Sequence, residues 1–125
     1  MSNLRKYDLY KEGYFKAETV EELLKLNDDA FIEDVIQTFK EESPKYLKQV
    51  RECFQARDYE RMRISLHQLK GSCGTIGAEK VRRFVMEMME KVDKGRISSL
   101  QQDCEQLEKL LVDLYEMLDI VYERK

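Results

Sequence analysis

Apolar residues recur at steps of three and four over most of this 125-residue chain, which indicates helices and gives no strand pattern. The longest such segment predicts a helix from residue 28 to about 55. Pro44 lies inside it, so we expect one kinked helix, with two helices meeting at residues 43–44 as the alternative. The inward positions of this segment are expected to be Phe31, Ile32, Val35, Ile36, Phe39, Leu47, Val50 and Phe54.

Three more helices are predicted after this one, at 59 to about 74, at 78 to about 94, and from about 100 to the C-terminus. Asp58 is the expected N-cap of the first of these, and Gly95 the left-handed residue that ends the second. Ser98 or Ser99 is expected to start the last, and residues 74–77 to form a connector. Inward stripes are predicted at Met62, Leu66, Leu69, Cys73, Ile76, Val81, Phe84, Val85, Met88, Val92, Leu100, Cys104, Leu107, Leu111, Leu114, Leu118 and Val121.

The N-terminal part predicts two shorter helices. One lies within residues 4–14 and ends near Gly13, and the other begins with Thr19 as N-cap and Glu22 as its capping-box partner. Asn27, Asp28 and Asp29 then interrupt the pattern and cap the next helix. Inward positions in the second helix are expected to be Val20, Leu23, Leu24 and Leu26.

Short connections between the long helices favour antiparallel neighbours, so the predicted fold is all-α. We expect a single domain over residues 1–125, in which an antiparallel four-helix bundle (about 28–123) carries additional short N-terminal helices (about 1–26). The formal net charge is −3, with both signs interspersed, which argues against nucleic acid as a partner.

The first residues lack the apolar core of a signal peptide, and no apolar run approaches the ~18 residues of a membrane span. We therefore expect a cytoplasmic protein that does not contact a membrane. We also expect a monomer, and at 15.0 kDa it is small enough to enter the nucleus passively. The three cysteines are expected to be free thiols.

His67, the single histidine, is the strongest candidate for chemistry. It lies 100° from Leu66 around the helix, at or beyond the edge of the buried stripe. Arg63, Lys70, Gly71 and Gly74 share its face. The cations favour a bound anion, and the glycines leave steric room beside the ring. This arrangement suits a phosphoryl group carried on the histidine.

The segment His67-Gln68-Leu69-Lys70-Gly71-Ser72, followed by Gly77-Ala78, resembles the signature of histidine-containing phosphotransfer (HPt) proteins. The resemblance covers nearly the whole chain and points to the stand-alone type found in plant cytokinin relays and in fungal osmosensing. Residues 31–39 with Glu42 and Ser43 resemble the long helix before the motif in plant members. The chain departs from the plant pattern at Cys73 and at Pro44. Some relatives carry Gln or Asn in place of the histidine and are inactive, so His67 implies a working carrier.

The resemblance implies a phosphorelay intermediate with no ATP site of its own. His67 would accept a phosphoryl group from the receiver domain of a hybrid histidine kinase and pass it to a response-regulator aspartate. Lys70 would hold a phosphate oxygen, Gly71 would give the receiver close access, and Ser72 would orient the imidazole or cap nearby backbone. Mg²⁺ is expected on the partner receiver, and no cofactor or metal on this chain.

The partner surface is expected to surround His67, with Ile64 as an apolar contact. Lys80, Arg82 and Arg83 either add positive charge there or simply form a solvated helix face. Between Met86 and Met89, we expect one to be exposed.

Two alternatives use the same residues differently. Cys53, Cys73, Cys104 and His67 could in principle form a Cys₃His zinc site, but no two cysteines have the close spacing of zinc ligands. The other alternative is a helical interaction module that binds receiver domains without being phosphorylated.

Overall fold

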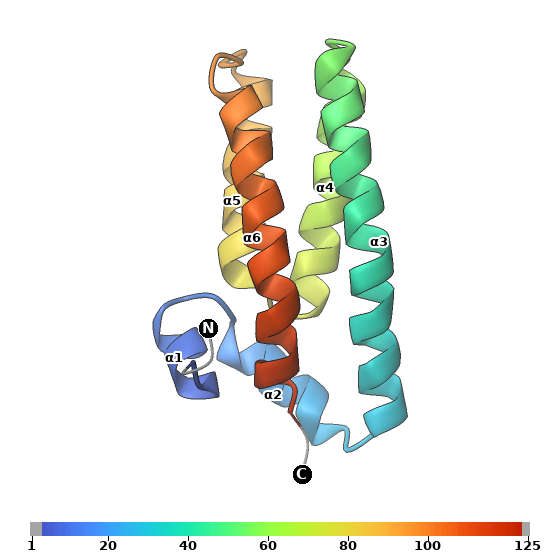
Figure 1. Ribbon diagram of the computed structural model, residues 1–125, viewed down its shortest axis with the longest axis vertical. Coiled ribbons are helices and arrows are strands. Elements are labelled where there is room, and N and C mark those ends of the chain that lie inside the picture. The colour runs from blue at the N-terminus through green and yellow to red at the C-terminus, as the bar shows by residue number, and fades with distance from the viewer. Residues whose placement is uncertain (1–3, 124–125) are drawn as a thin grey trace.

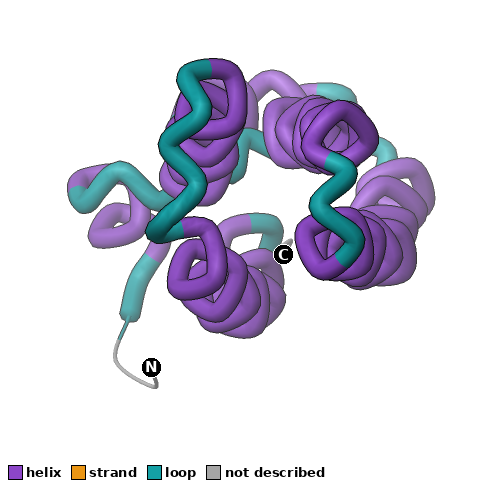
Figure 2. Tube along the Cα trace, turned by 90° about the horizontal axis from the view of Figure 1, so that it is seen from above, coloured by secondary structure: helices purple, strands orange, loops and turns teal. Residues whose placement is uncertain are grey.

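The computed structural model describes residues 4–123, which form six helices and no strand. Four long helices form the bundle: α3 (Asp29–Gln55), α4 (Tyr59–Thr75), α5 (Glu79–Asp93) and α6 (Leu100–Val121). Two short helices, α1 (Lys6–Lys11) and α2 (Ala17–Lys25), lie at one end of it (Figure 1). Viewed along the bundle, the four long helices occupy four corners around a common core (Figure 2). The predicted all-α bundle with added N-terminal helices is confirmed.

Capping side chains fix where two of the long helices begin. The Asp28 carboxylate accepts a hydrogen bond from the Phe31 amide at 3.0 Å, and the Asp58 carboxylate accepts one from the Arg61 amide at 3.1 Å. Each satisfies an amide that has no partner inside its helix. Gly95 has φ +70° just after α5, as predicted for a left-handed helix end.

Pro44 lies inside an unbroken α3, so one long helix is correct and two helices are not. The buried Ser43 hydroxyl donates to the Phe39 carbonyl at 2.7 Å. The Tyr115 hydroxyl of α6 lies 2.7 Å from the Ser43 hydroxyl oxygen. A polar contact therefore joins α3 to α6 next to the proline.

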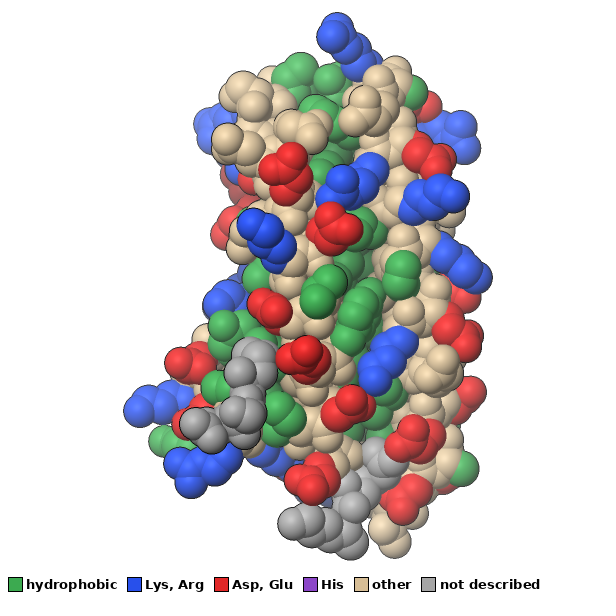
Figure 3. Space-filling model, in the orientation of Figure 1, with side chains coloured by type: hydrophobic (Ala, Val, Ile, Leu, Met, Phe, Trp, Pro, Cys, Tyr) green, Lys and Arg blue, Asp and Glu red, His purple; other side chains and the backbone are tan. Residues whose placement is uncertain are grey.

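The face over α3 and α6 carries intermixed basic and acidic side chains (Figure 3).

Three N-terminal expectations are wrong. Thr19 is not an N-cap, because α2 begins two residues earlier, with Lys16 as its N-cap. Leu26 is 59% exposed and Phe31 is 44% exposed, although both were expected to face inward. Leu26 is the C-cap of α2, at the turn before α3, and Phe31 lies on the outward side of α3, next to the buried Ile32.

The connector between α4 and α5 is shorter than predicted, because Gly74 and Thr75 are still helical and Ala78 is the N-cap of α5. The N-terminal segment holds this connector. The Lys16 amide donates to the Gly77 carbonyl at 2.8 Å, and the Lys80 ammonium lies 4.1 Å from the centre of the Tyr14 ring. The buried Tyr122 hydroxyl donates to the Ile76 carbonyl at 2.8 Å. The end of α4 is therefore fixed from two sides.

Within residues 4–123, no helix is both long and apolar enough to cross a bilayer.

Candidate functional site

His67 lies on the outer face of α4, the helix that packs most extensively against both α3 and α5. The inward face of α4 is formed by fully buried apolar side chains, which set its rotation in the bundle. These are Met62, Leu66, Leu69 and Cys73. One residue beyond Leu66, the His67 side chain is exposed, as the periodicity predicted.

Gly71 leaves open space one turn beyond His67. A Cβ added there would have no contact within 4 Å other than its chain neighbours and its own helix backbone. Gly74 differs, because a Cβ there would lie 3.8 Å from Cδ of Arg82. The clearance expected from both glycines is therefore complete at Gly71, whereas the Arg82 side chain from α5 borders Gly74.

Arg63 occupies the α5 side of the same face, one turn before His67. Its Nε and Nη2 donate to the two carboxylate oxygens of Asp93 at 2.6 and 3.2 Å, a bidentate pair between α4 and α5. This contact raises the pKa of Arg63 and lowers the pKa of Asp93. The sequence placed Arg63 beside His67 correctly but gave no sign of Asp93, which lies 30 residues away on another helix.

The remaining cations that were considered for the site fall into two groups. Arg82 Nη2 and Arg83 Nε both donate to Oε1 of Glu79, at 2.7 and 3.1 Å. Their hydrogen bonds lower the pKa of Glu79, with Arg82 as the larger cause. Lys70, in contrast, has no hydrogen bond or ion pair with any residue in the described range. Lys70 is thus the cation beside His67 that no carboxylate engages.

Ser72 does not share the His67 face. It lines a cavity of about 330 Å³ between α3 and α4, together with Val35, Phe39, Tyr46 and Thr75 among others. The resemblance gave Ser72 a role in orienting the imidazole or capping backbone, whereas the side chain is directed toward α3. The nearby Thr75 hydroxyl donates to the Gly71 carbonyl at 3.2 Å.

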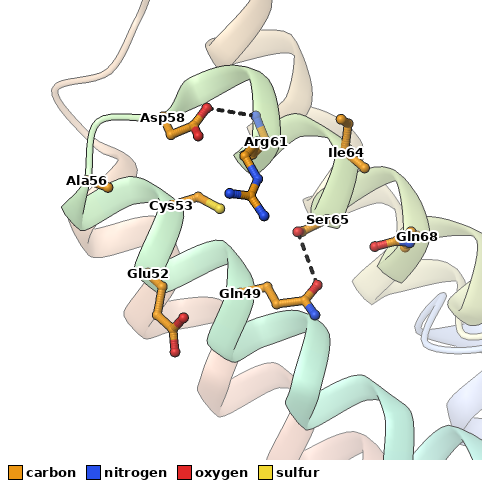
Figure 4. Close-up of a pocket in the computed structure, with 9 residues that line it drawn as sticks. All are labelled: Gln49, Glu52, Cys53, Ala56, Asp58, Arg61, Ile64, Ser65 and Gln68. Carbon is orange, nitrogen blue, oxygen red and sulfur yellow. Dashed lines mark hydrogen bonds between the residues drawn. The ribbon is translucent and has the colours of Figure 1, made fainter.

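Ile64 is 56% exposed, which agrees with its expected place on the partner surface. It borders a second cavity between α3 and α4, of about 440 Å³ (Figure 4). The Arg61 guanidinium points into this space, and Ser65 donates to the Gln49 side-chain oxygen at 3.3 Å across it. Arg61 and Gln49 could not be predicted as neighbours from the sequence, because the cavity exists only where α3 meets α4.

The residues proposed as zinc ligands do not come together. Within the described range, no three His, Cys, Asp or Glu side chains are grouped so as to hold a metal ion. Cys73 and Cys104 are buried in the core, and burial raises the pKa of their thiols to about 12 and about 11. As expected for the methionine pair, Met86 is 42% exposed and Met89 is buried.

Comparison with known families and proteins gives a consistent result. The family model for the Hpt domain matches residues 34–119. Histidine-containing phosphotransfer protein 2 of Arabidopsis thaliana is 28% identical over 122 residues, which cover 90% of this chain and 78% of the relative. Pseudo histidine-containing phosphotransfer protein 1 of Oryza sativa subsp. japonica is 25% identical over 89 residues, which cover 67% of this chain and 48% of the relative.

Two solved structures share the fold. Histidine-containing phosphotransfer protein B of Pseudomonas aeruginosa matches with a TM-score of 0.79 and 20% identity, over 90% of this chain and 96% of the other. A rice protein described as a candidate histidine-containing phosphotransfer protein matches with a TM-score of 0.81 and 18% identity, over 92% of this chain and 85% of the other.

Proposed function

Because this chain belongs to the Hpt domain family, we propose that it is a phosphorelay intermediate that carries a phosphoryl group on His67. The donor is the receiver domain of a hybrid histidine kinase, and the acceptor is an aspartate of a response regulator. The supporting observation is the exposed His67 with open space at Gly71 one turn away. A receiver aspartate can reach the ring only if the partner approaches the helix closely, and a glycine permits that approach.

The transfer is a nucleophilic displacement at phosphorus. An unprotonated ring nitrogen of His67 forms the new nitrogen–phosphorus bond. The bond from phosphorus to the receiver's aspartate oxygen breaks, and that oxygen leaves with the electron pair. The second transfer reverses these bonds with a different aspartate, so the carrier returns unchanged.

Lys70 is assigned the electrostatic part of this chemistry on the carrier's side. Its ammonium has no carboxylate partner in residues 4–123 and is free to contact a phosphoryl oxygen. Mg²⁺ belongs, in this proposal, to the receiver's acidic pocket, and the chain itself needs no cofactor. It therefore acts as a carrier that supplies one half of a shared site.

The remaining parts of the proposal follow the family resemblance. The carrier works as a monomer, in the cytoplasm and with access to the nucleus, and its partners are receiver domains instead of nucleic acids or membranes. A role in plant cytokinin signalling stays a prediction that follows from the family resemblance alone.

Phosphotransfer from a phosphorylated receiver domain tests the central claim. Wild type is expected to become labelled and the His67→Gln variant to remain unlabelled, while Glu116→Gln, on the exposed side of α6, serves as a control substitution outside the His67 face and is expected to be labelled as wild type is. Equal labelling of wild type and His67→Gln would refute the assignment of His67. Receiver binding without labelling of either protein would favour the interaction module.

A further inference from the structure

Arg63 is a second cation on the His67 face, and its guanidinium is already hydrogen-bonded to the Asp93 carboxylate. Both partners are about half exposed, at 46% and 47%. The contact is bidentate, with both carboxylate oxygens engaged by one guanidinium. Such a geometry holds the arginine in one orientation better than a single contact would.

Asp93 occupies an unfavourable place for an acidic residue. It is the last residue of α5, where the helix dipole disfavours negative charge. Glu79 and Glu90 of the same helix pair locally, Glu79 with Arg82 and Glu90 with Lys94, the residue that follows α5. The Asp93 side chain instead pairs with Arg63 of α4. This contact offsets the unfavourable position of a negative charge at the C-terminal end of α5.

Arg63 is within reach of a group carried on His67. Residues four apart on a helix have Cβ atoms about 5–6 Å from each other. Helical side chains lean toward the N-terminal end of their helix, so the His67 ring leans over the turn that Arg63 occupies, and Lys70 leans toward His67. By the same rule Arg63 leans away from the ring while it pairs with Asp93, and it has to turn back toward His67 to contact a phosphoryl group. After that turn, a phosphoryl group on the ring would lie between two cations.

We propose that Asp93 is a positioning residue that holds Arg63 while His67 is unmodified and releases it to the phosphoryl oxygens once His67 is phosphorylated. This inference rests on the proposed function. The exchange makes and breaks no covalent bond, because two hydrogen bonds of Arg63 move from a carboxylate to a phosphoryl group. A phosphoryl group carries about −1.5 to −2 charge, against −1 for the carboxylate, so it is the stronger acceptor.

The Arg63–Asp93 contact also affects the equilibrium between unmodified and phosphorylated His67. In the unmodified protein the Asp93 contact must be broken before Arg63 can help the phosphoryl group. Replacing Asp93 by Asn removes that competition and favours the phosphorylated form. Contacts between exposed ion pairs of this kind change an equilibrium by up to about fivefold, so we expect a gain of roughly two- to fivefold for Asp93→Asn.

The first measurement uses phosphoramidate, a small phosphoryl donor that needs no receiver domain. The NMR signal of the Arg63 side-chain Nε–H reports its acceptor directly. We expect this signal to shift when wild type is phosphorylated on His67, while that of Arg51, which pairs with Glu108 between α3 and α6, stays in place. An unchanged Arg63 signal in the phosphorylated protein overturns the inference.

The second measurement is the equilibrium fraction of phosphorylated carrier with a phosphorylated receiver. Asp93→Asn is expected to raise it, Asp93→Glu to restore a value near wild type, and Glu108→Gln, which breaks the comparable distant pair, to leave it unchanged. Arg63→Gln is expected to lower it, and the double variant Arg63→Gln with Asp93→Asn to equal Arg63→Gln alone. An increase in the double variant, or no increase in Asp93→Asn, contradicts the inference.

The two proposals fail differently. If a phosphorylated receiver labels no variant while phosphoramidate still shifts the Arg63 signal, the relay function is wrong and the role of Asp93 stands. If the receiver labels His67 but Asp93→Asn behaves as wild type, the relay function stands and the role of Asp93 is wrong.

Discussion

Gly77 lies against Thr19 so closely that a Cβ added to the glycine would be 3.1 Å from the Thr19 Cβ. The same Cβ would lie 3.3 Å from the Lys16 carbonyl oxygen. Gly77 also has φ +72°, a backbone conformation that favours glycine. The glycine at the end of the motif therefore allows the N-terminal segment to pack closely against the connector. Gly71, in contrast, borders open space.

Replacing Gly77 by Ala is expected to destabilise the protein more than replacing Gly95. Both glycines have left-handed φ, but Gly95 has no contact within 4 Å of the added Cβ. Gly95→Ala therefore isolates the cost of backbone strain, about 1–2 kcal/mol. Gly77→Ala adds the clash with α2, which we expect to cost a further ~1–2 kcal/mol because a packed neighbour must move. Urea unfolding of the two variants measures the difference.

The added cost at Gly77 should fall only in part when Thr19 is also changed to Ala, because this removes the Thr19 Cγ2 at 3.3 Å but keeps the Thr19 Cβ at 3.1 Å and the Lys16 carbonyl oxygen at 3.3 Å. Equal destabilisation by Gly77→Ala and Gly95→Ala would show that the contact with α2 carries no energetic weight.

Gly71 should behave in the opposite way, because its side is open. Gly71→Ala lies in the interior of α4 with no neighbouring atom to displace, so we expect stability to rise by roughly 0.5–1 kcal/mol from helix propensity. Phosphotransfer from a receiver should nevertheless slow from Gly to Ala to Leu, as the side chain fills the space that the partner needs. Thermal unfolding and transfer rates of the three proteins test both parts. Unimpaired transfer by the Leu variant would mean that no partner approaches Gly71.

The three cysteine thiols should differ in how fast they react with a disulfide reagent. Cys53 is half-buried, whereas Cys73 and Cys104 are buried and their thiol pKa values are raised to about 12 and about 11. Since the thiolate is the reactive form, a disulfide reagent at neutral pH should modify one thiol quickly in the folded protein and all three after unfolding. Cys53→Ser should remove the fast phase. A second fast thiol in that variant would contradict the burial of Cys73 or Cys104.

Glu79 should contribute to the loss of stability in acid. Its hydrogen bonds to Arg82 and Arg83 lower its pKa below the ordinary value of 4.5. The stabilisation is therefore complete above about pH 4.5 and is lost as the pH falls through the lower pKa of the folded state. Glu79→Gln should unfold with a shallower dependence on pH in this range. Glu116→Gln, on the exposed side of α6, should keep the wild-type dependence.

The helical stripes were predictable because each depends on neighbours three and four residues away. Leu66 and Leu69 alone oriented His67 outward, since rotation about a helix is fixed by its buried side. Leu26 and Phe31 fail for a related reason. Leu26 lies in the turn after α2, and Phe31 stands beside Ile32, which is only 2% exposed, so the edge of the buried stripe runs between these two residues of α3. The spacing of apolar residues does not show where that edge falls.

The sequence by itself determined the helical type of the long segments, the outward direction of His67, and the cation and glycine that accompany it. All of these follow from local spacing along one helix. Only the tertiary structure decided that Asp93 pairs with Arg63 and that Gly77 packs against Thr19 of α2. Such contacts join residues that are far apart in the sequence, and their distances are set by how the helices pack.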